Sequence, residues 1–158
     1  MSLKKLLDER LEEVFLVLTM VAMVVLIFAQ VLCRYVFESS LSWSEELARY
    51  IHIWQIWIGA SFAVRKREHI KVEAFKNLFN ETGRKCIDFI AIILWFCLAV
   101  FLAVAGTSLV TTILSKGQSS PAMQLPMWLV YSAIPLGGLL MSIRLIQQLY
   151  FLFKPEKQ

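Results

Sequence analysis

The charged residues whose types and spacing could do chemistry are concentrated between residues 34 and 49. Glu45 and Arg49 are one helical turn apart, so they can form an ion pair worth roughly 0.3–0.5 kcal/mol when exposed. Long apolar stretches flank the group, which places it at the ends of membrane helices and not at their middle, where ionisable residues are costly. We interpret the group as a structural clamp between two helix ends, with docking of a soluble partner on the outer face as the alternative. The group consists of the charged residues Arg34, Glu38, Glu45, Glu46 and Arg49 together with the neighbouring aromatic residue Trp43.

Other reactive side chains do not form a recognisable site. A membrane haem of the b type normally needs two facing histidines, whereas His52 and His69 belong to the same helical stretch, so we expect no haem. We interpret His52 as a hydrogen-bonded packing residue. Arg144 either snorkels to the membrane surface or pairs with a partner subunit. Because no metal-ligand spacing, P-loop, G-x-S-x-G or paired-carboxylate motif is present, we predict no enzyme activity, no cofactor and no metal.

A helix over residues 44–65 must position the charged group. Ser42-x-x-Glu45 has the pattern of a capping box, in which both side chains satisfy free amides at a helix start. No formal charge occurs from Tyr50 to Val64, and a basic cluster begins at Arg65. With its approach included, this helix is ~36 Å long at 1.5 Å per residue, enough to cross a bilayer core of ~30 Å.

The same helix has two different faces when its residues are placed 100° apart. One face is polar at its start and small at its end, which suits close packing against another helix. The opposite face is bulky and aromatic, which suits lipid or a large partner. The first contains Glu45, Arg49, His52, Ile56, Gly59 and Ala63, and the second contains Trp43, Tyr50, Trp54, Trp57 and Ser61. We predict packing against a partner subunit through Tyr50, Trp54, Trp57, Gly59 and Ala63, and leave open which face meets it.

The composition predicts an all-α membrane protein. The chain is 58% hydrophobic and 18% charged, and its charges are segregated from long apolar runs that are each able to span a membrane. We expect one membrane domain over residues 1–158 with four transmembrane helices, at about 14–33, 44–65, 87–114 and 126–146. Small residues at Ala99, Ala103, Gly106 and Thr107 suit close helix packing, and Pro135 should kink the last helix.

Residues 70–80 are predicted to form an amphipathic helix in the membrane interface, because Val72, Phe75, Leu78 and Phe79 recur at helical spacing. The alternative is a short cytoplasmic loop with incidental periodicity. The N-terminal segment mixes both charge signs and lacks an A-x-A site, so we do not expect a cleavable signal peptide. The three cysteines are too scattered for a disulfide framework.

Lysines and arginines are distributed unequally between the two sides of the predicted membrane domain. One side has Lys4, Lys5, Arg10, Arg65, Lys66, Arg67, Lys71, Lys76, Arg84, Lys85, Arg144, Lys154 and Lys157, and the other has Arg34, Arg49 and Lys116. The positive-inside rule then places the first side, and both termini, in the cytoplasm. The charge distribution gives no sign of nucleic-acid binding.

Several segments together resemble the small membrane subunit of tripartite ATP-independent periplasmic (TRAP) transporters. They are Arg34-Tyr-Val-Phe, Leu41-Ser-Trp-Ser-Glu-Glu-Leu-Ala-Arg49, Gly59-Ala60, His69-Ile-Lys-Val-Glu73, Ser120-Pro-Ala-Met-Gln-Leu-Pro-Met-Trp128, Tyr131 and Ile134-Pro-Leu-Gly137. The resemblance covers nearly the whole chain, and Glu73 departs from it mildly, at a position where aspartate is expected more often.

The resemblance implies a location in the bacterial inner membrane and a set of partners. Such subunits pair with a large transport subunit that carries the substrate and sodium sites, and a periplasmic binding protein delivers an organic acid. The small subunit resembles a fixed scaffold, surrounded by membrane lipids, beside a moving transport domain. The substrate is left open between sialic acid, a C4-dicarboxylate and other carboxylates.

Two other functions compete with this interpretation. A membrane anchor of a respiratory enzyme would show haem absorbance. A self-sufficient small transporter would need an acidic residue inside the membrane, and the middles of the last three predicted spans have none.

Overall fold

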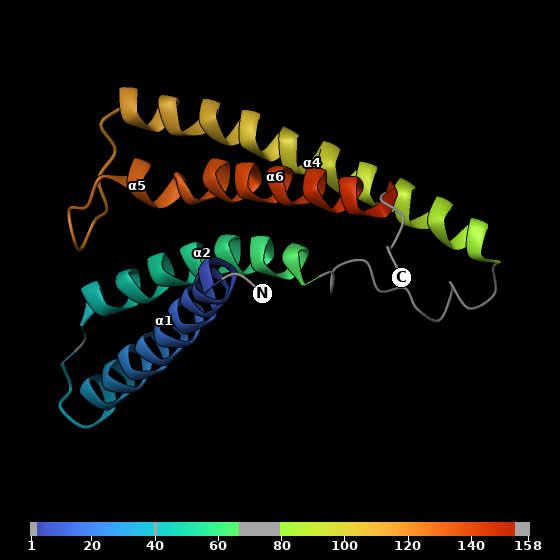
Figure 1. The fold of residues 1–158 in the computed structure, drawn as a ribbon. Coiled ribbons are helices and arrows are strands. Elements are labelled where there is room, and N and C mark those ends of the chain that lie inside the picture. The colour runs from blue at the N-terminus through green and yellow to red at the C-terminus, as the bar shows by residue number, and fades with distance from the viewer. Residues whose placement is uncertain (1–2, 40, 67–79, 154–158) are drawn as a thin grey trace.

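The computed structural model describes residues 3–39, 41–66 and 80–153, and over these residues the chain is helical and contains no β-strand (Figure 1). The helices are α1 (Leu3–Tyr35), α2 (Ser42–Arg65), α4 (Glu81–Ser115), α5 (Met127–Tyr131) and α6 (Ala133–Phe153). The predicted all-α class is confirmed. The predicted interfacial helix over residues 70–80 lies almost entirely outside the described residues.

Three stretches are long and apolar enough to cross a membrane, namely Glu12–Tyr35, Gly83–Ser115 and Met127–Tyr150. They correspond to the first, third and fourth predicted spans. The helix α2 has 24 residues and therefore the necessary length. It does not meet the same criterion of composition, because polar residues such as His52 and Gln55 interrupt its apolar sequence. A membrane-crossing α2 thus stays a prediction.

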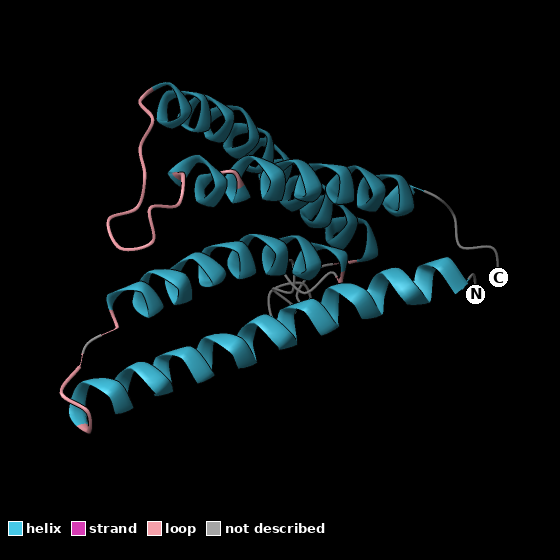
Figure 2. Cartoon of the chain, turned by 90° about the vertical axis from the view of Figure 1, so that its left-hand side faces the viewer, coloured by secondary structure: helices cyan, strands magenta, loops and turns pink. Residues whose placement is uncertain are grey.

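The long helices form a row in the order α1, α2, α6, α4. Each packs against its neighbour in this order, and the short helix α5 lies in line with the start of α6 and contacts α4 and α2 as well. Figures 1 and 2 show the row from two sides, with α2 between α1 and the pair of α4 and α6. Among the described elements, the backbone of α1 packs closely only against α2, and a Glu12–Arg144 ion pair also links α1 to α6. Most of α1 is therefore exposed.

Small residues bring α4 and α6 together. A Cβ atom added at Gly138 of α6 would lie 2.8 Å from the backbone N of Ala103 and 2.8 Å from the backbone O of Ala99. One added at Gly106 would lie 3.0 Å from side-chain atoms of Ile134 and Pro135. The prediction of close packing is confirmed for Ala99, Ala103 and Gly106, whereas Thr107 is exposed.

The two faces of α2 meet two different neighbours within the chain. On the aromatic face, the Cβ of Trp57 lies 2.8 Å from where a Cβ of Gly137 in α6 would be. On the opposite face, Gly59 lies next to Leu16 of α1, and the Gln55 side chain donates a hydrogen bond to the Leu16 carbonyl at 3.4 Å. The aromatic face is thus largely covered by this chain itself.

The last predicted span is interrupted at Ser132, between α5 and α6. Pro135 lies just after this interruption and has no N–H to donate to the preceding turn. The kink expected at this proline therefore appears as a break between two helices.

The start of α2 differs from the prediction. Leu41 is the N-cap residue, and no side chain caps the helix. The hydroxyl of Ser44 donates to the Leu41 carbonyl at 2.7 Å, while Glu45 makes contacts elsewhere. The predicted capping box is wrong, because the N-cap residue is Leu41, which has no capping side chain, and Ser42 is already the first residue of the helix.

Candidate functional site

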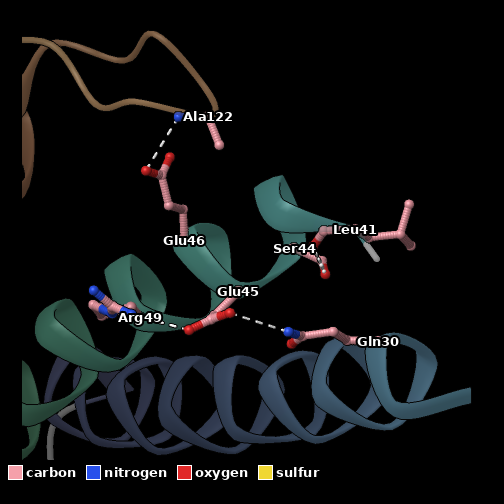
Figure 3. A network of polar contacts seen from close by, with 7 residues as sticks. All are labelled: Gln30, Leu41, Ser44, Glu45, Glu46, Arg49 and Ala122. Carbon is pink, nitrogen blue, oxygen red and sulfur yellow. Dashed lines mark hydrogen bonds and ion pairs between the residues drawn. The ribbon is translucent and has the colours of Figure 1, made fainter. Parts of the chain in front are cut away.

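The first turns of α2 hold a network of polar contacts (Figure 3). The Glu45 carboxylate accepts a hydrogen bond from Arg49 Nη2 at 3.2 Å and another from Gln30 Nε2 at 3.3 Å. Since Gln30 belongs to α1, these contacts join the end of α1 to the start of α2. The side chains of Arg49 and Glu45 are 64% and 57% exposed, so their ion pair contributes little stability by itself.

Glu46 makes the longer-range connection. Its carboxylate accepts hydrogen bonds from the backbone N–H groups of Ala122 at 3.2 Å and Met123 at 3.0 Å. These residues lie in the loop between α4 and α5, so one side chain ties α2 to a loop more than 70 positions later in the sequence. The sequence places Glu46 in the charged group but does not reveal this partner, because every residue except proline has the same backbone N–H group.

The loop that Glu46 holds has its own internal hydrogen bonds. The buried Ser120 donates its N–H to the Leu125 carbonyl at 2.8 Å and accepts the Leu125 N–H on its hydroxyl at 3.2 Å. Gln124 has a left-handed backbone (φ 55°) at the turn, and the N–H of Met127 reaches the Gln118 carbonyl at 2.9 Å. The loop is thus a folded turn and can present a defined surface.

An open depression lies between this loop and α2. Its volume is about 410 Å³, and it is lined by Ser42, Glu45, Glu46, Arg49, Pro121 and Ala122. Carboxylate and guanidinium groups line the same depression, so it could bind a polar surface that carries both charge signs.

The other predicted members of the charged group lie outside this network. Arg34 and Glu38 are exposed, and within the described part of the chain no hydrogen bond or ion pair joins them to the network. Trp43 is 45% exposed. The structure therefore brings together Glu45, Glu46 and Arg49, with Gln30 as an additional member.

We expect Glu46→Gln to loosen the loop. The N–H groups of Ala122 and Met123 bond to different oxygens of the Glu46 carboxylate, and glutamine has an NH₂ group, which donates, in place of one of these oxygens. The backbone amides of Ala122 and Met123 should exchange their hydrogens several-fold faster, as measured by hydrogen–deuterium exchange on the purified subunit. Glu45→Gln is the matched control and should leave this exchange unchanged. Equal exchange in both variants would show that Glu46 does not hold the loop.

A second charged cluster lies at the other end of α2. Glu12 of α1 accepts hydrogen bonds from Arg65 Nη1 of α2 at 3.3 Å and from Arg144 Nη2 of α6. The three side chains are only 12% to 24% exposed. Next to them, Gln148 donates its side-chain amide to the Val64 carbonyl in the last turn of α2. Arg144 thus pairs with a residue of its own chain. This contact differs from both predicted roles, which are snorkelling to the membrane surface and pairing with a partner subunit.

His52 does not fulfil its predicted role. It is exposed on α2, and in the described part of the chain no hydrogen bond satisfies its imidazole. Its interpretation as a hydrogen-bonded packing residue is therefore wrong for contacts within this chain. Over the described residues, no three His, Cys, Asp or Glu side chains group in a way that could hold a metal ion.

The residues predicted to pack against a partner subunit have different surroundings. Tyr50 is buried and donates its hydroxyl to Met127 Sδ at 3.5 Å, and Trp57 packs on Gly137. Trp54, Gly59 and Ala63 are half-buried. Their contact with a partner stays a prediction.

Comparison with known proteins identifies related chains. The family model described as tripartite ATP-independent periplasmic transporters, DctQ component, matches residues 23–154. A Haemophilus influenzae protein whose name assigns it to the small permease proteins of TRAP transporters is 30% identical, over 91% of this chain and 91% of its own.

Two longer relatives match the chain over part of their length. The isethionate TRAP transporter permease protein DctMQ of Oleidesulfovibrio alaskensis is 30% identical over 90% of this chain, which spans 24% of the relative. The sialic acid TRAP transporter permease protein SiaT of Haemophilus influenzae is 32% identical over 84% of this chain, which spans 21% of the relative.

Proposed function

The chain belongs to the family of DctQ components of TRAP transporters, and from this premise we propose that it is a scaffold subunit that pairs with a large permease subunit during sodium-driven uptake of an organic acid. Its family is that of a transporter component, so the chain works in transport and an enzymatic activity is not indicated.

The observation that carries the proposal is the length of the relatives. Nearly the whole chain corresponds to about a quarter of a single permease protein, DctMQ, and to about a fifth of another, SiaT. In those proteins the equivalent of this chain is covalently joined to a much larger part. The part of a permease to which this sequence corresponds is therefore best understood as the smaller of two parts that work together.

The contacts at the two ends of α2 support a static role. Glu12, Arg65 and Arg144 connect three helices at one end, while Glu45 and Glu46 connect α2 to α1 and to the loop before α5 at the other. A helix held at both ends is suited to supporting a moving partner, and not to moving itself.

The class of substrate is inferred from the relatives. Their names mention isethionate, C4-dicarboxylate and sialic acid, which are organic anions, and ectoine, a zwitterion that carries a carboxylate. We assign the substrate and sodium sites to the large subunit, as the resemblance implies. Membrane anchoring of a respiratory enzyme is not favoured by any of these relatives.

We further propose that a periplasmic binding protein docks over the depression at the start of α2. The depression offers Glu45, Glu46 and Arg49 next to the folded loop, and Arg34, Glu38 and Trp43 lie on the same exposed end. The clamp and the docking surface are compatible, because the Glu46 carboxylate that holds the loop also lines the depression.

Reconstitution tests the proposed division of labour. In liposomes with a sodium gradient, the chain alone should move none of the organic acids named above. Together with its large subunit and binding protein it should support uptake of one of them, measured with radiolabelled substrates. Uptake by the isolated chain would contradict the scaffold role. The large subunit without this chain is the matched control and should lose uptake.

Reporter fusions test the predicted orientation. The excess of lysine and arginine on one side predicts that fusions after Gln158, or within residues 66–84, report a cytoplasmic location. Fusions within residues 117–120 should report the periplasm. A periplasmic C-terminus would contradict the predicted orientation. If the N-terminus is then cytoplasmic, it would also contradict the count of four spans, because an even number of crossings returns the chain to its starting side.

A further inference from the structure

We infer that the open flank of α2 is where a transmembrane helix of the large permease subunit packs, and that this helix supplies a hydrogen-bonding partner for His52. We define the flank by its exposed residues Arg49, His52 and Ile56. The inference rests on the proposed pairing with a large subunit and adds the surface of contact and its chemistry.

The depth of His52 makes its exposure significant. It lies ten positions after the first residue of α2 and thirteen before the last, which is ~15 Å from one end and ~20 Å from the other. If α2 crosses the membrane as proposed, His52 is near the middle of the hydrocarbon core, where water is absent.

In the hydrocarbon core, lipid cannot satisfy the hydrogen-bonding groups of the His52 imidazole. In its neutral form one ring nitrogen donates and the other accepts a hydrogen bond, and lipid tails offer neither group. Within the described part of the chain His52 makes no hydrogen bond, although Gln55 on the same helix reaches Leu16 of α1. Ionisable residues within membrane helices nearly always pair or face a protein interior. Since the described residues offer His52 no hydrogen bond, we assign its partner to another chain.

The other exposed faces at this depth are suited to lipid. On α4 they consist of apolar side chains such as Leu94, Phe101 and Val104, and on α1 of residues such as Val21 and Val24. Among the described residues, His52 is the one exposed His, Asp, Glu, Lys or Arg near the middle of a long helix. Because the exposed ionisable residue is on α2, we expect the large subunit to contact α2 and lipid to contact the apolar faces of α1 and α4.

A small residue next to the flank favours close packing of a second helix. Ala63 follows Ile56 two turns later on the same side of α2, and its small side chain permits close approach of a second backbone. On the aromatic face, α5 covers Tyr50 and α6 covers Trp57. These residues are therefore not available for contact with the large subunit.

Site-specific photo-crosslinking in the assembled complex locates the partner. A photoreactive amino acid at Ile56, one turn from His52, should give an adduct with the large subunit. The same probe at Phe101 of α4 is the matched control, since Phe101 is also an exposed apolar residue, and it should give none. Adducts of Ile56 with lipid or with a second copy of this chain would overturn the inference, as would an adduct with the large subunit at Phe101 alone.

Substitution of His52 tests the hydrogen bond. His52→Leu should reduce recovery of the large subunit in co-purification roughly 3- to 20-fold, as expected for loss of one interhelical hydrogen bond in a membrane, and His52→Asn should retain most of it. The thermal unfolding midpoint of the isolated subunit should not fall in either variant, because the His52 side chain makes no hydrogen bond among the residues that the structure describes. Unchanged recovery with His52→Leu would overturn the inference.

The two proposals fail in distinguishable ways. If the wild-type chain does not co-purify with the large subunit, the proposed function is wrong. If it co-purifies while the probe at Ile56 finds no large subunit, only the assignment of the flank is wrong.

Discussion

Replacing Gly138 by alanine should lower the free energy of unfolding of the purified subunit by about 1–3 kcal/mol, the usual cost of inserting a methyl group into a well-packed contact. The added Cβ would lie 2.8 Å from two backbone atoms of α4, those of Ala99 and Ala103. Backbone atoms cannot rotate away, so α4 and α6 must separate along their contact. Much of the apolar core lies there, including Ile92, Met141 and Leu145.

Two other glycines provide a graded control for this result. At Gly106 the nearest atoms to an added Cβ are 3.0 Å away, and at Gly59 the nearest is 3.8 Å away. Gly106→Ala should therefore cost less than Gly138→Ala. Gly59→Ala should be neutral or stabilising by up to about 1 kcal/mol, because alanine favours a helix over glycine. Thermal or denaturant unfolding in detergent measures all three, and equal costs at the three positions would contradict the packing shown here.

Replacing Glu12 by alanine should cost about 3 kcal/mol of stability. Removing one member of a buried ion pair typically costs about 3–5 kcal/mol, because the remaining charge stays buried without compensation. Here Arg65 and Arg144 would both lose the Glu12 carboxylate. We expect the lower end of that range, because the three side chains retain 12% to 24% exposure and water can reach part of the cluster.

A double-mutant cycle separates this effect from a general loss of packing. Arg144→Met in the Glu12→Ala background should recover part of the lost stability, because it removes one of the uncompensated charges. Glu13→Ala is the matched control and should change stability little, since Glu13 is exposed. If Glu12→Ala and Glu13→Ala behave alike in unfolding experiments, the cluster does not hold the three helices together.

The sequence by itself determined the class of the protein and the positions of its long helices, but not all of their ends, because α1 begins at Leu3 and α6 ends at Phe153, well beyond the predicted spans. Long uncharged runs require helices wherever a chain enters lipid, because each backbone polar group must then be bonded internally. Local spacing also predicted the Glu45–Arg49 pair, the small residues between α4 and α6, and the interruption near Pro135. The family followed from motifs such as Trp43-Ser-Glu-Glu46.

The tertiary structure alone decided the partners of the polar residues. Glu46 bonds to backbone amides in a distant loop, Glu12 pairs with arginines of two other helices, and His52 is left without a partner in the described part of the chain. A helical wheel places these side chains on faces but does not say which helix covers each face. The covering depends on the order α1, α2, α6, α4, which arises from close contacts such as those at Gly137 and Gly138 and has no local signature in the sequence.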